Sequence, residues 1–232
     1  MKIFDILDRF DYTFAQAGLR GTWEEGSGLC PECKSSPSTK RTQPLVIYWK
    51  PGSDILGDFA WIGTYMVMTE AVMNALLSRF SGFEAGPVEM IQDPKLRPPK
   101  RITKRTKPRI WLPYAGPTLY EVWKTSWVSA DLARSTIDLV NDCTTCGTKD
   151  YRVEGLEKYV PARDLRTGEL FPRRIPRVSG AGIFVRDRDL GGASIFGVSQ
   201  LRGPTLCTEQ VKAFIEEQQY TNVTFVEVGD VI

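Results

Sequence analysis

Histidine is entirely absent from this chain of 232 residues. Because histidine is the commonest general base and the commonest catalytic metal ligand, its absence excludes Ser-His-Asp and Cys-His catalysis. It also excludes hydrolytic zinc sites that keep an open coordination position beside two or three imidazoles. The sequence further lacks a phosphate-binding loop, a dinucleotide-binding fingerprint and a distinctive pair of carboxylates. We therefore expect a protein that is not an enzyme.

Long apolar runs are missing as well. No segment approaches the length needed to cross a bilayer, and the first residues lack the basic, apolar and small-residue order of a signal peptide. Hydrophobic residues nevertheless make up 42% of the chain, which is enough for one large or two small buried cores. The sequence thus predicts a globular, cytoplasmic protein with no membrane insertion.

Five cysteines are present, and four of them form two C-x-x-C pairs. Cys30 and Cys33 make the first pair, and Cys143 and Cys146 make the second. Such a pair places two thiolates on one tight turn, where both can reach the same ion, and two pairs complete a tetrahedron. Gly147, after the second pair, suits the positive φ of a metal-binding turn. We predict one structural Zn²⁺ bound by all four cysteines, with no open position for a substrate.

Redox-active pairs and unpaired core cysteines are the alternatives for these thiols. Neither pair opens a helix after a buried strand, where the helix dipole would lower a thiol pKa. An enzyme built on redox-active pairs would show thiol-dependent turnover and no bound metal. The fifth cysteine, Cys207, lies at the end of an apolar run, and we assign it to the core.

Charge is distributed unevenly along the chain. Residues 93–109 contain eight Lys or Arg, one Asp and four Pro, a net charge of +7, whereas the other 22 basic and 27 acidic residues sum to −5. The prolines and the lack of apolar periodicity predict an exposed linker. The alternative is a phosphate-binding surface, which the lack of interleaved aromatics and the acidic remainder disfavour. Two further arginine groups would extend such a surface: Arg173, Arg174 and Arg177, then Arg186 and Arg188.

Tryptophan residues near the linker are assigned to the core or to interfaces rather than to base stacking, because they lie in strand-like runs. They are Trp111, Trp123 and Trp127.

The two sides of the linker share an ordered set of motifs. In the first half the order is Ile55-Leu56-Gly57, Gly63, Thr69-Glu70-Ala71-Val72 and Val88-Glu89-Met90; in the second it is Ile195-Phe196-Gly197, Gly203, Thr208-Glu209-Gln210-Val211 and Val226-Glu227-Val228. Each set reads as strand, helix, strand. Thr69 and Thr208 are predicted to be N-cap residues whose side-chain oxygen accepts a backbone N–H, and each helix has one apolar stripe. A chance coincidence is the alternative, because capped amphipathic helices are common.

This repeat predicts an α+β fold of two related halves that pack as one unit. Residues 1–92 form the first half with the first cysteine pair, residues 93–109 form the linker, and residues 110–232 form the second half with the second pair. A zinc-ribbon-like site of four cysteines joins the halves. Each strand-helix-strand unit needs extra strands to cover its apolar face. The candidates are Leu45–Trp49, Ile110–Pro113, Leu119–Trp127 and Ile137–Val140.

The two cysteine pairs occur together with four further motifs. These are Gly57-Asp58-Phe59-Ala60-Trp61, Gly86-Pro87-Val88-Glu89-Met90, Gly116-Pro117-Thr118-Leu119-Tyr120-Glu121, and the stretch from Leu206-Cys207-Thr208-Glu209 to Phe225-Val226. Over nearly the whole chain this set resembles the double-CXXCG motif proteins, a paralogous family abundant in myxobacteria. The first cysteine pair departs from the family pattern, because Lys34 stands where a glycine is expected.

Members of that family include immunity proteins that neutralise cognate toxins of the Sit type. The resemblance therefore implies a non-catalytic, cytosolic protein whose partner is a toxin, and a mildly acidic body would suit a basic toxin. The alternative function is a zinc-ribbon-like nucleic-acid-binding module that uses the linker, whose affinity would fall steeply with salt. We expect the first function, with nucleic acid not a partner.

Overall fold

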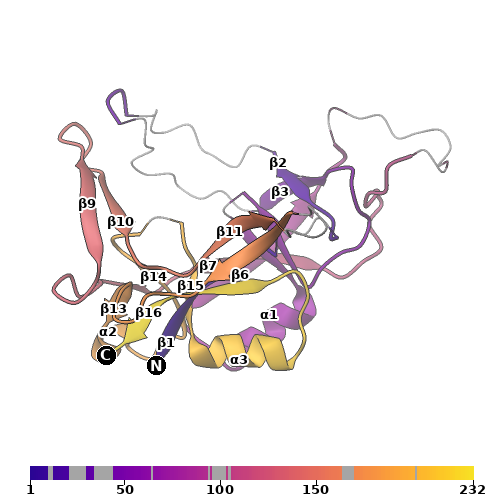
Figure 1. Ribbon diagram of the computed structural model, residues 1–232. Helices are drawn as coiled ribbons and strands as arrows, with labels where there is room; N and C mark the ends of the chain where they lie inside the picture. Colours follow the sequence, from indigo (N-terminus) through magenta and orange to yellow (C-terminus); the bar gives the residue numbers. More distant parts are fainter. Residues whose placement is uncertain are drawn as a thin grey trace.

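The computed structural model describes residues 1–9, 13–20, 30–33, 44–63, 65–93, 95, 103, 106–163, 170–201 and 203–232, except for the side chains of 159–163 and 170–173. This part of the chain is mostly sheet with few helices. It contains two six-stranded sheets and two separate two-stranded hairpins (Figure 1). No helix within it is long and apolar enough to cross a membrane.

The first six-stranded sheet has the strand order β2-β3-β6-β7-β5-β4. Helix α1 (Glu70–Leu77) connects β5 to β6, and only the β3–β6 pair is parallel. The strands are β2 (Ala17–Leu19), β3 (Leu45–Trp49), β4 (Phe59–Ile62), β5 (Tyr65–Thr69), β6 (Phe83–Met90) and β7 (Leu119–Lys124).

The second six-stranded sheet has the order β13-β16-β1-β15-β14-β8. Helix α3 (Glu209–Glu217) connects β15 to β16, and the short helix α2 (Asp187–Leu190) follows β13. The strands are β1 (Lys2–Leu7), β8 (Trp127–Val128), β13 (Ile183–Val185), β14 (Ile195–Val198), β15 (Leu206–Thr208) and β16 (Thr224–Val231).

Five strands of one sheet match five strands of the other in order and direction. The antiparallel pairs β4–β5, β5–β7 and β7–β6 correspond to β14–β15, β15–β1 and β1–β16. The parallel pair β6–β3 corresponds to β16–β13. In both sheets the helix therefore connects two strands that flank the same central strand, β7 or β1.

The predicted boundaries at residues 92 and 110 do not separate the two sheets. Strand β7 follows the linker but completes the first sheet, and β1 opens the chain but completes the second. The reason is that each strand-helix-strand unit leaves a gap one strand wide between its own two strands. A central strand from elsewhere in the chain fills that gap and satisfies the backbone donors and acceptors on both sides.

The two helices begin where the sequence predicts, but without the predicted side-chain caps. Thr69 and Thr208 occupy the N-cap positions with extended backbone, and neither side chain makes a capping hydrogen bond. Each threonine is also the last residue of a buried strand, with 6% and 3% of its surface exposed. Its side chain is consequently held among strand neighbours rather than over the helix terminus.

One core lies between the two sheets and joins them. Helices α1 and α3 lie side by side (Figure 1), and the rings of Phe80 and Phe214 meet edge to face at 5.6 Å. The Asn222 side chain donates a hydrogen bond of 2.9 Å to the backbone oxygen of Phe59. The buried apolar side chains of this cluster come from β1, α3, β15 and β16 as well as from the first sheet. The two sheets thus pack together through this cluster.

The end of the predicted linker is buried rather than exposed. Arg109 is 4% exposed, lies 3.2 Å from the Asp93 carboxylate, and donates a hydrogen bond of 2.7 Å to the backbone oxygen of Trp49. The ion pair therefore closes residues 93–109 into a loop anchored at the end of β3. Most of that segment lies outside the described residues. Residues 110–113, predicted as a strand, form none.

Replacing Arg109 by Met should lower the free energy of unfolding by about 3 kcal/mol, because it leaves the buried Asp93 carboxylate without its cation. Chemical denaturation measures this. Lys107→Met is the control, because Lys107 is exposed. If Arg109→Met and Lys107→Met cost the same, the buried ion pair does not anchor the loop.

Asp5 is the one acidic residue of strand β1 and has apolar neighbours on both sides along the strand. Burial raises the pKa of Asp5 to about 7, and the opposing effects of Lys124 and of nearby backbone N–H groups are smaller. Its Oδ1 atom is buried and has no hydrogen-bond partner in the described part of the chain. The folded protein therefore holds a proton on Asp5 more tightly than the unfolded chain does.

Asp5→Asn should consequently stabilise the protein more at pH 8 than at pH 5, by about 2 kcal/mol. The folded-state pKa lies above the unfolded value, so the stability linked to this proton is lost as pH rises from about 4 to about 7. An asparagine side chain does not titrate in this range, so its contribution to stability does not change with pH. Urea unfolding at the two pH values measures the difference, with the exposed Asp138→Asn as control. Equal gains at both pH values would contradict the assignment.

Candidate metal centre

The second cysteine pair lies in the turn of a separate two-stranded hairpin, β9 (Ile137–Asp142) and β10 (Lys149–Val153). The Cys143 N–H donates to the Thr148 oxygen at 2.9 Å, and the Gly147 N–H donates to the Cys143 oxygen at 2.7 Å. Gly147 has a φ of +70°, as predicted. These bonds shape a tight turn that points both thiols in the same direction.

The first pair lies in a turn at residues 30–33. The flanking residues 21–29 and 34–43 lie outside the described part of the chain, and Lys34 is among them. Cys30 is 4% exposed and Cys33 is partly buried, which matches the burial of Cys143 and Cys146 in turn. Each turn thus contributes one inner and one outer thiol.

All four sulfur atoms lie within 4.8 Å of one another. The two contacts between the turns are Cys30 Sγ to Cys143 Sγ at 3.7 Å and Cys33 Sγ to Cys146 Sγ at 3.5 Å. Sulfur atoms placed tetrahedrally at about 2.3 Å from one ion are separated by about 3.8 Å. None of these cysteines forms a disulfide. The group is therefore able to hold a metal ion, and the donor set consists of thiolates alone.

Polar groups next to the cluster contact its outer thiol and join the two turns. The Thr148 hydroxyl lies 3.2 Å from Cys146 Sγ, and this contact, the Thr148 backbone and the neighbouring thiols together lower the pKa of Cys146, whereas the pKa of Cys143 is raised. Glu32 accepts a hydrogen bond of 2.5 Å from the Thr145 hydroxyl, which joins the two turns directly. The spacing analysis did not single out Glu32, Thr145 or Thr148. The only available signal was their position within or directly after the C-x-x-C pairs.

The hairpin with the second cysteine pair belongs to neither six-stranded sheet. It projects from the body of the protein (Figure 1) and is anchored at its base by Thr136, whose N–H donates to the Gly182 oxygen at 2.9 Å. The cluster therefore links the amino-terminal segment to a separate hairpin. The cluster brings residues 1–92 and 110–232 together, as predicted, but through a hairpin that lies outside the two six-stranded sheets.

The fifth cysteine and the tryptophans have different environments. Cys207 lies on β15 with no exposed surface, and burial raises its pKa well above the usual value, so its assignment to the core is confirmed. Trp111 and Trp123 are partly buried. Trp127 is 53% exposed, with the Lys124 ammonium 4.9 Å from its ring centroid, so it is not a core residue.

The arginines considered for phosphate binding mostly contact acidic side chains. Arg174 lies 2.6 Å from Glu157, Arg177 contacts Glu227 and Asp230, and Arg186 lies 2.9 Å from Asp131. Arg188 is exposed beside Asp189, and the Arg173 side chain lies outside the described residues. These ion pairs reduce the positive potential that a phosphate backbone would meet.

No protein-family model matches the chain, and no curated protein matches it. We therefore infer its function from its own residues and from the resemblance described above.

Serine at Cys30 or Cys143 should abolish stoichiometric metal binding and lower the free energy of unfolding, because three thiolates hold the ion less tightly. Elemental analysis of the purified protein and thermal denaturation with and without a chelator measure both effects. Cys207→Ala is the matched control, since it removes a buried thiol outside the cluster. Equal metal content in Cys30→Ser, Cys143→Ser and Cys207→Ala would contradict a four-cysteine site.

Proposed function

We propose that this chain is a non-catalytic, cytosolic immunity protein that binds and neutralises a cognate toxin, and that a structural zinc ion stabilises it. The observation that carries the proposal is the resemblance of both C-x-x-C pairs and their accompanying motifs to the double-CXXCG motif proteins. The proximity of the four sulfur atoms supports the metal-binding part of the proposal, because it brings two pairs that are far apart in sequence to one place.

Zinc is the ion that this donor set favours. Four thiolates in a tetrahedral arrangement suit Zn²⁺, which has no redox chemistry and no geometric demand beyond the tetrahedron. When bound, the ion supplies folding free energy rather than Lewis acidity, because four protein ligands leave no position for a substrate. The residues that would hold it are Cys30, Cys33, Cys143 and Cys146.

We further propose that the fold is a duplicated α+β unit. The repeated motifs and the five matching strands of each sheet support this interpretation. In this view, the strand at the centre of the ancestral sheet came after the strand-helix-strand segment along the chain, just as β7 follows β6. The second copy then obtains its central strand, β1, from the amino terminus, which lies beside the carboxyl end: the Val231 N–H donates to the Met1 oxygen at 2.7 Å.

A binding role is preferred to catalysis because the chain has no histidine and its clustered thiols are all potential metal ligands. A nucleic-acid-binding module is the second candidate, and the basic segment 93–109 is what favours it. The pairing of Arg174, Arg177 and Arg186 with carboxylates weighs against extending that surface over the body of the protein.

Expression of the chain should restore growth to cells that produce the toxin encoded next to its own gene. Growth curves with each neighbouring candidate toxin measure this, and a toxin from an unrelated locus is the control. Cys143→Ser should protect less, because it loosens the protein. If the chain restores growth against none of the neighbouring toxins, the immunity role is ruled out.

Gel-shift titration separates the second candidate from the first. A nucleic-acid-binding module would shift DNA or RNA at low salt, and the affinity would fall steeply as salt rises. We expect no shift even at low salt. A salt-dependent shift together with failed protection would favour the nucleic-acid role.

A further inference from the structure

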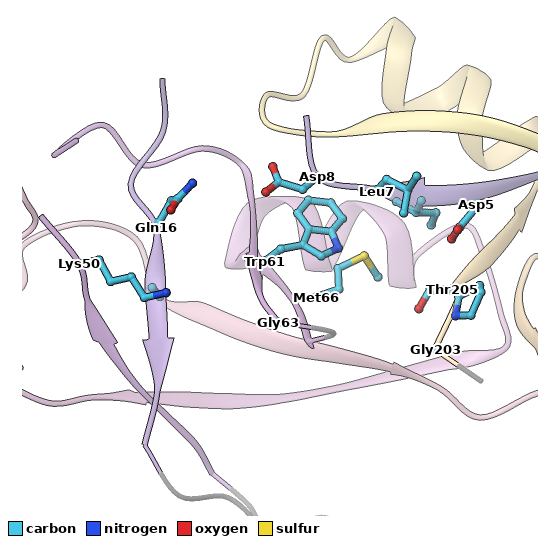
Figure 2. A pocket seen from close by; sticks show the side chains of 13 residues that line it. Asp5, Leu7, Asp8, Gln16, Lys50, Trp61, Gly63, Met66, Gly203 and Thr205 are labelled. Carbon is cyan, nitrogen blue, oxygen red and sulfur yellow. The ribbon is translucent and has the colours of Figure 1, made fainter. Parts of the chain in front are cut away.

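A cavity of about 530 Å³ opens between the two six-stranded sheets, and none of the four clustered cysteines is among the described residues that line it (Figure 2). One wall comes from β1 and the loop at Gly203–Thr205, which belong to the second sheet. The other comes from the β4–β5 hairpin, the start of β2 and the end of β3, which belong to the first. Its volume falls within the range of pockets that bind small ligands. Sequence reasoning did not identify this site.

The half-buried Asp5 carboxylate marks one end of the cavity. Its Oδ1 atom is out of reach of solvent and has no hydrogen-bond partner among the residues described, so a ligand would meet the other carboxylate oxygen. The nearest cation, Lys124, donates instead to the backbone oxygens of Gly203 and Pro204 at 2.9 and 2.5 Å. Burial keeps the pKa of Asp5 near 7, so at neutral pH a cation entering the cavity would favour the ionised form. An acceptor of this kind is suited to a positively charged ligand.

An apolar surface continues from Asp5 across the cavity. Figure 2 shows the Trp61 indole and the Met66 side chain between Asp5 at one end and Lys50 at the other. The Trp61 ring stacks on the fully buried Phe59 ring at 5.9 Å, which fixes its position. An indole face attracts cations, and a thioether packs well against methylene groups. The surface therefore suits an apolar stem that ends in a charged group.

The charges that line the cavity favour a cation over an anion. Asp5 and Asp8 are acidic, and Lys50 is the basic residue among the lining side chains that the structure describes. Lys50 is exposed and lies at the far end from Asp5 in Figure 2. It would therefore repel a positive group at that end of a ligand more than a positive group beside Asp5. A ligand with one positive group can thus meet Asp5 at the end of the cavity away from Lys50.

We propose that this cavity is a binding site for an organic ammonium group on an apolar stem, with Asp5 as its counter-ion and Trp61 and Met66 as the surface beneath the stem. The same chemistry occurs in small primary amines and in lysine side chains of proteins. The proposal does not depend on the immunity role, and the site uses none of the metal-binding cysteines.

Titration of ¹⁵N-labelled protein with n-butylammonium at pH 7.5 tests this, with n-butanol as the neutral isostere. We expect saturable shifts of the Ile6 and Thr205 amides and of the Trp61 indole N–H with the ammonium, and weaker binding of the alcohol. Asp5→Asn should weaken ammonium binding about tenfold or more, because it removes the counter-ion. Asp138→Asn, the same change at an exposed position outside the cavity, should leave it unchanged.

A parallel titration with Nα-acetyl-lysine methylamide distinguishes the two sources of the ammonium group. Tighter binding of this probe than of butylammonium supports a lysine side chain of a partner protein as the natural occupant. Tighter binding of butylammonium supports a small amine. The proposal is overturned if neither probe gives saturable shifts, if the alcohol binds as well as the ammonium, or if folded Asp5→Asn binds butylammonium as tightly as the unaltered protein.

Discussion

The contact between two cysteine pairs that lie 113 positions apart is the constraint on which the arrangement of this protein depends. Without an ion, four thiols at such short separations make only weak contacts with one another. An ion between them would form a bond to each of the four sulfur atoms. A cross-link between distant positions also removes conformational freedom from the unfolded chain, and this effect grows with the length of the closed loop. An ion in the cluster would therefore hold residues 30–33 against the turn at residues 143–146.

The two six-stranded sheets depend on a second long-range constraint. Each has its central strand supplied from outside the strand-helix-strand unit, and in the second sheet that strand is β1. Residues 30–33 follow β1 and β2 along the chain, so the cysteine cluster lies on the same amino-terminal segment that supplies the central strand of the second sheet. An ion held by the four cysteines would therefore restrain the segment that carries β1. The cavity between the sheets is formed partly by β1 and shares this dependence.

Local patterns in the sequence predicted the parts of the structure that depend on local physics. The C-x-x-C spacing identified all four members of the cluster, because two thiols on one turn are set by neighbouring residues. The threonine-glutamate pairs placed the start of α1 and α3, since an N-terminus depends on a few adjacent positions. The absence of threonine capping bonds was not predictable, because it follows from burial in strands that only the folded protein defines.

Features that depend on distant pairing were not predictable in the same way. Nothing in the run Lys2–Leu7 distinguishes a strand that joins the second sheet from one that joins the first. Arg109 belongs to a basic, proline-rich segment, and its burial depends on Asp93 and on the end of β3. Asp5 is the one acidic residue of β1 and lies between apolar residues. This pattern marks the position as unusual, but it does not predict the cavity that Asp5 lines.

X-ray absorption spectroscopy at the zinc edge, on protein purified without added metal, tests the central claim most directly. The account predicts about one zinc ion per chain with four sulfur neighbours at about 2.3 Å and no nitrogen or oxygen neighbours. Zinc bound by nitrogen or oxygen atoms, or a folded protein whose four cysteines are thiols without any metal, would contradict it.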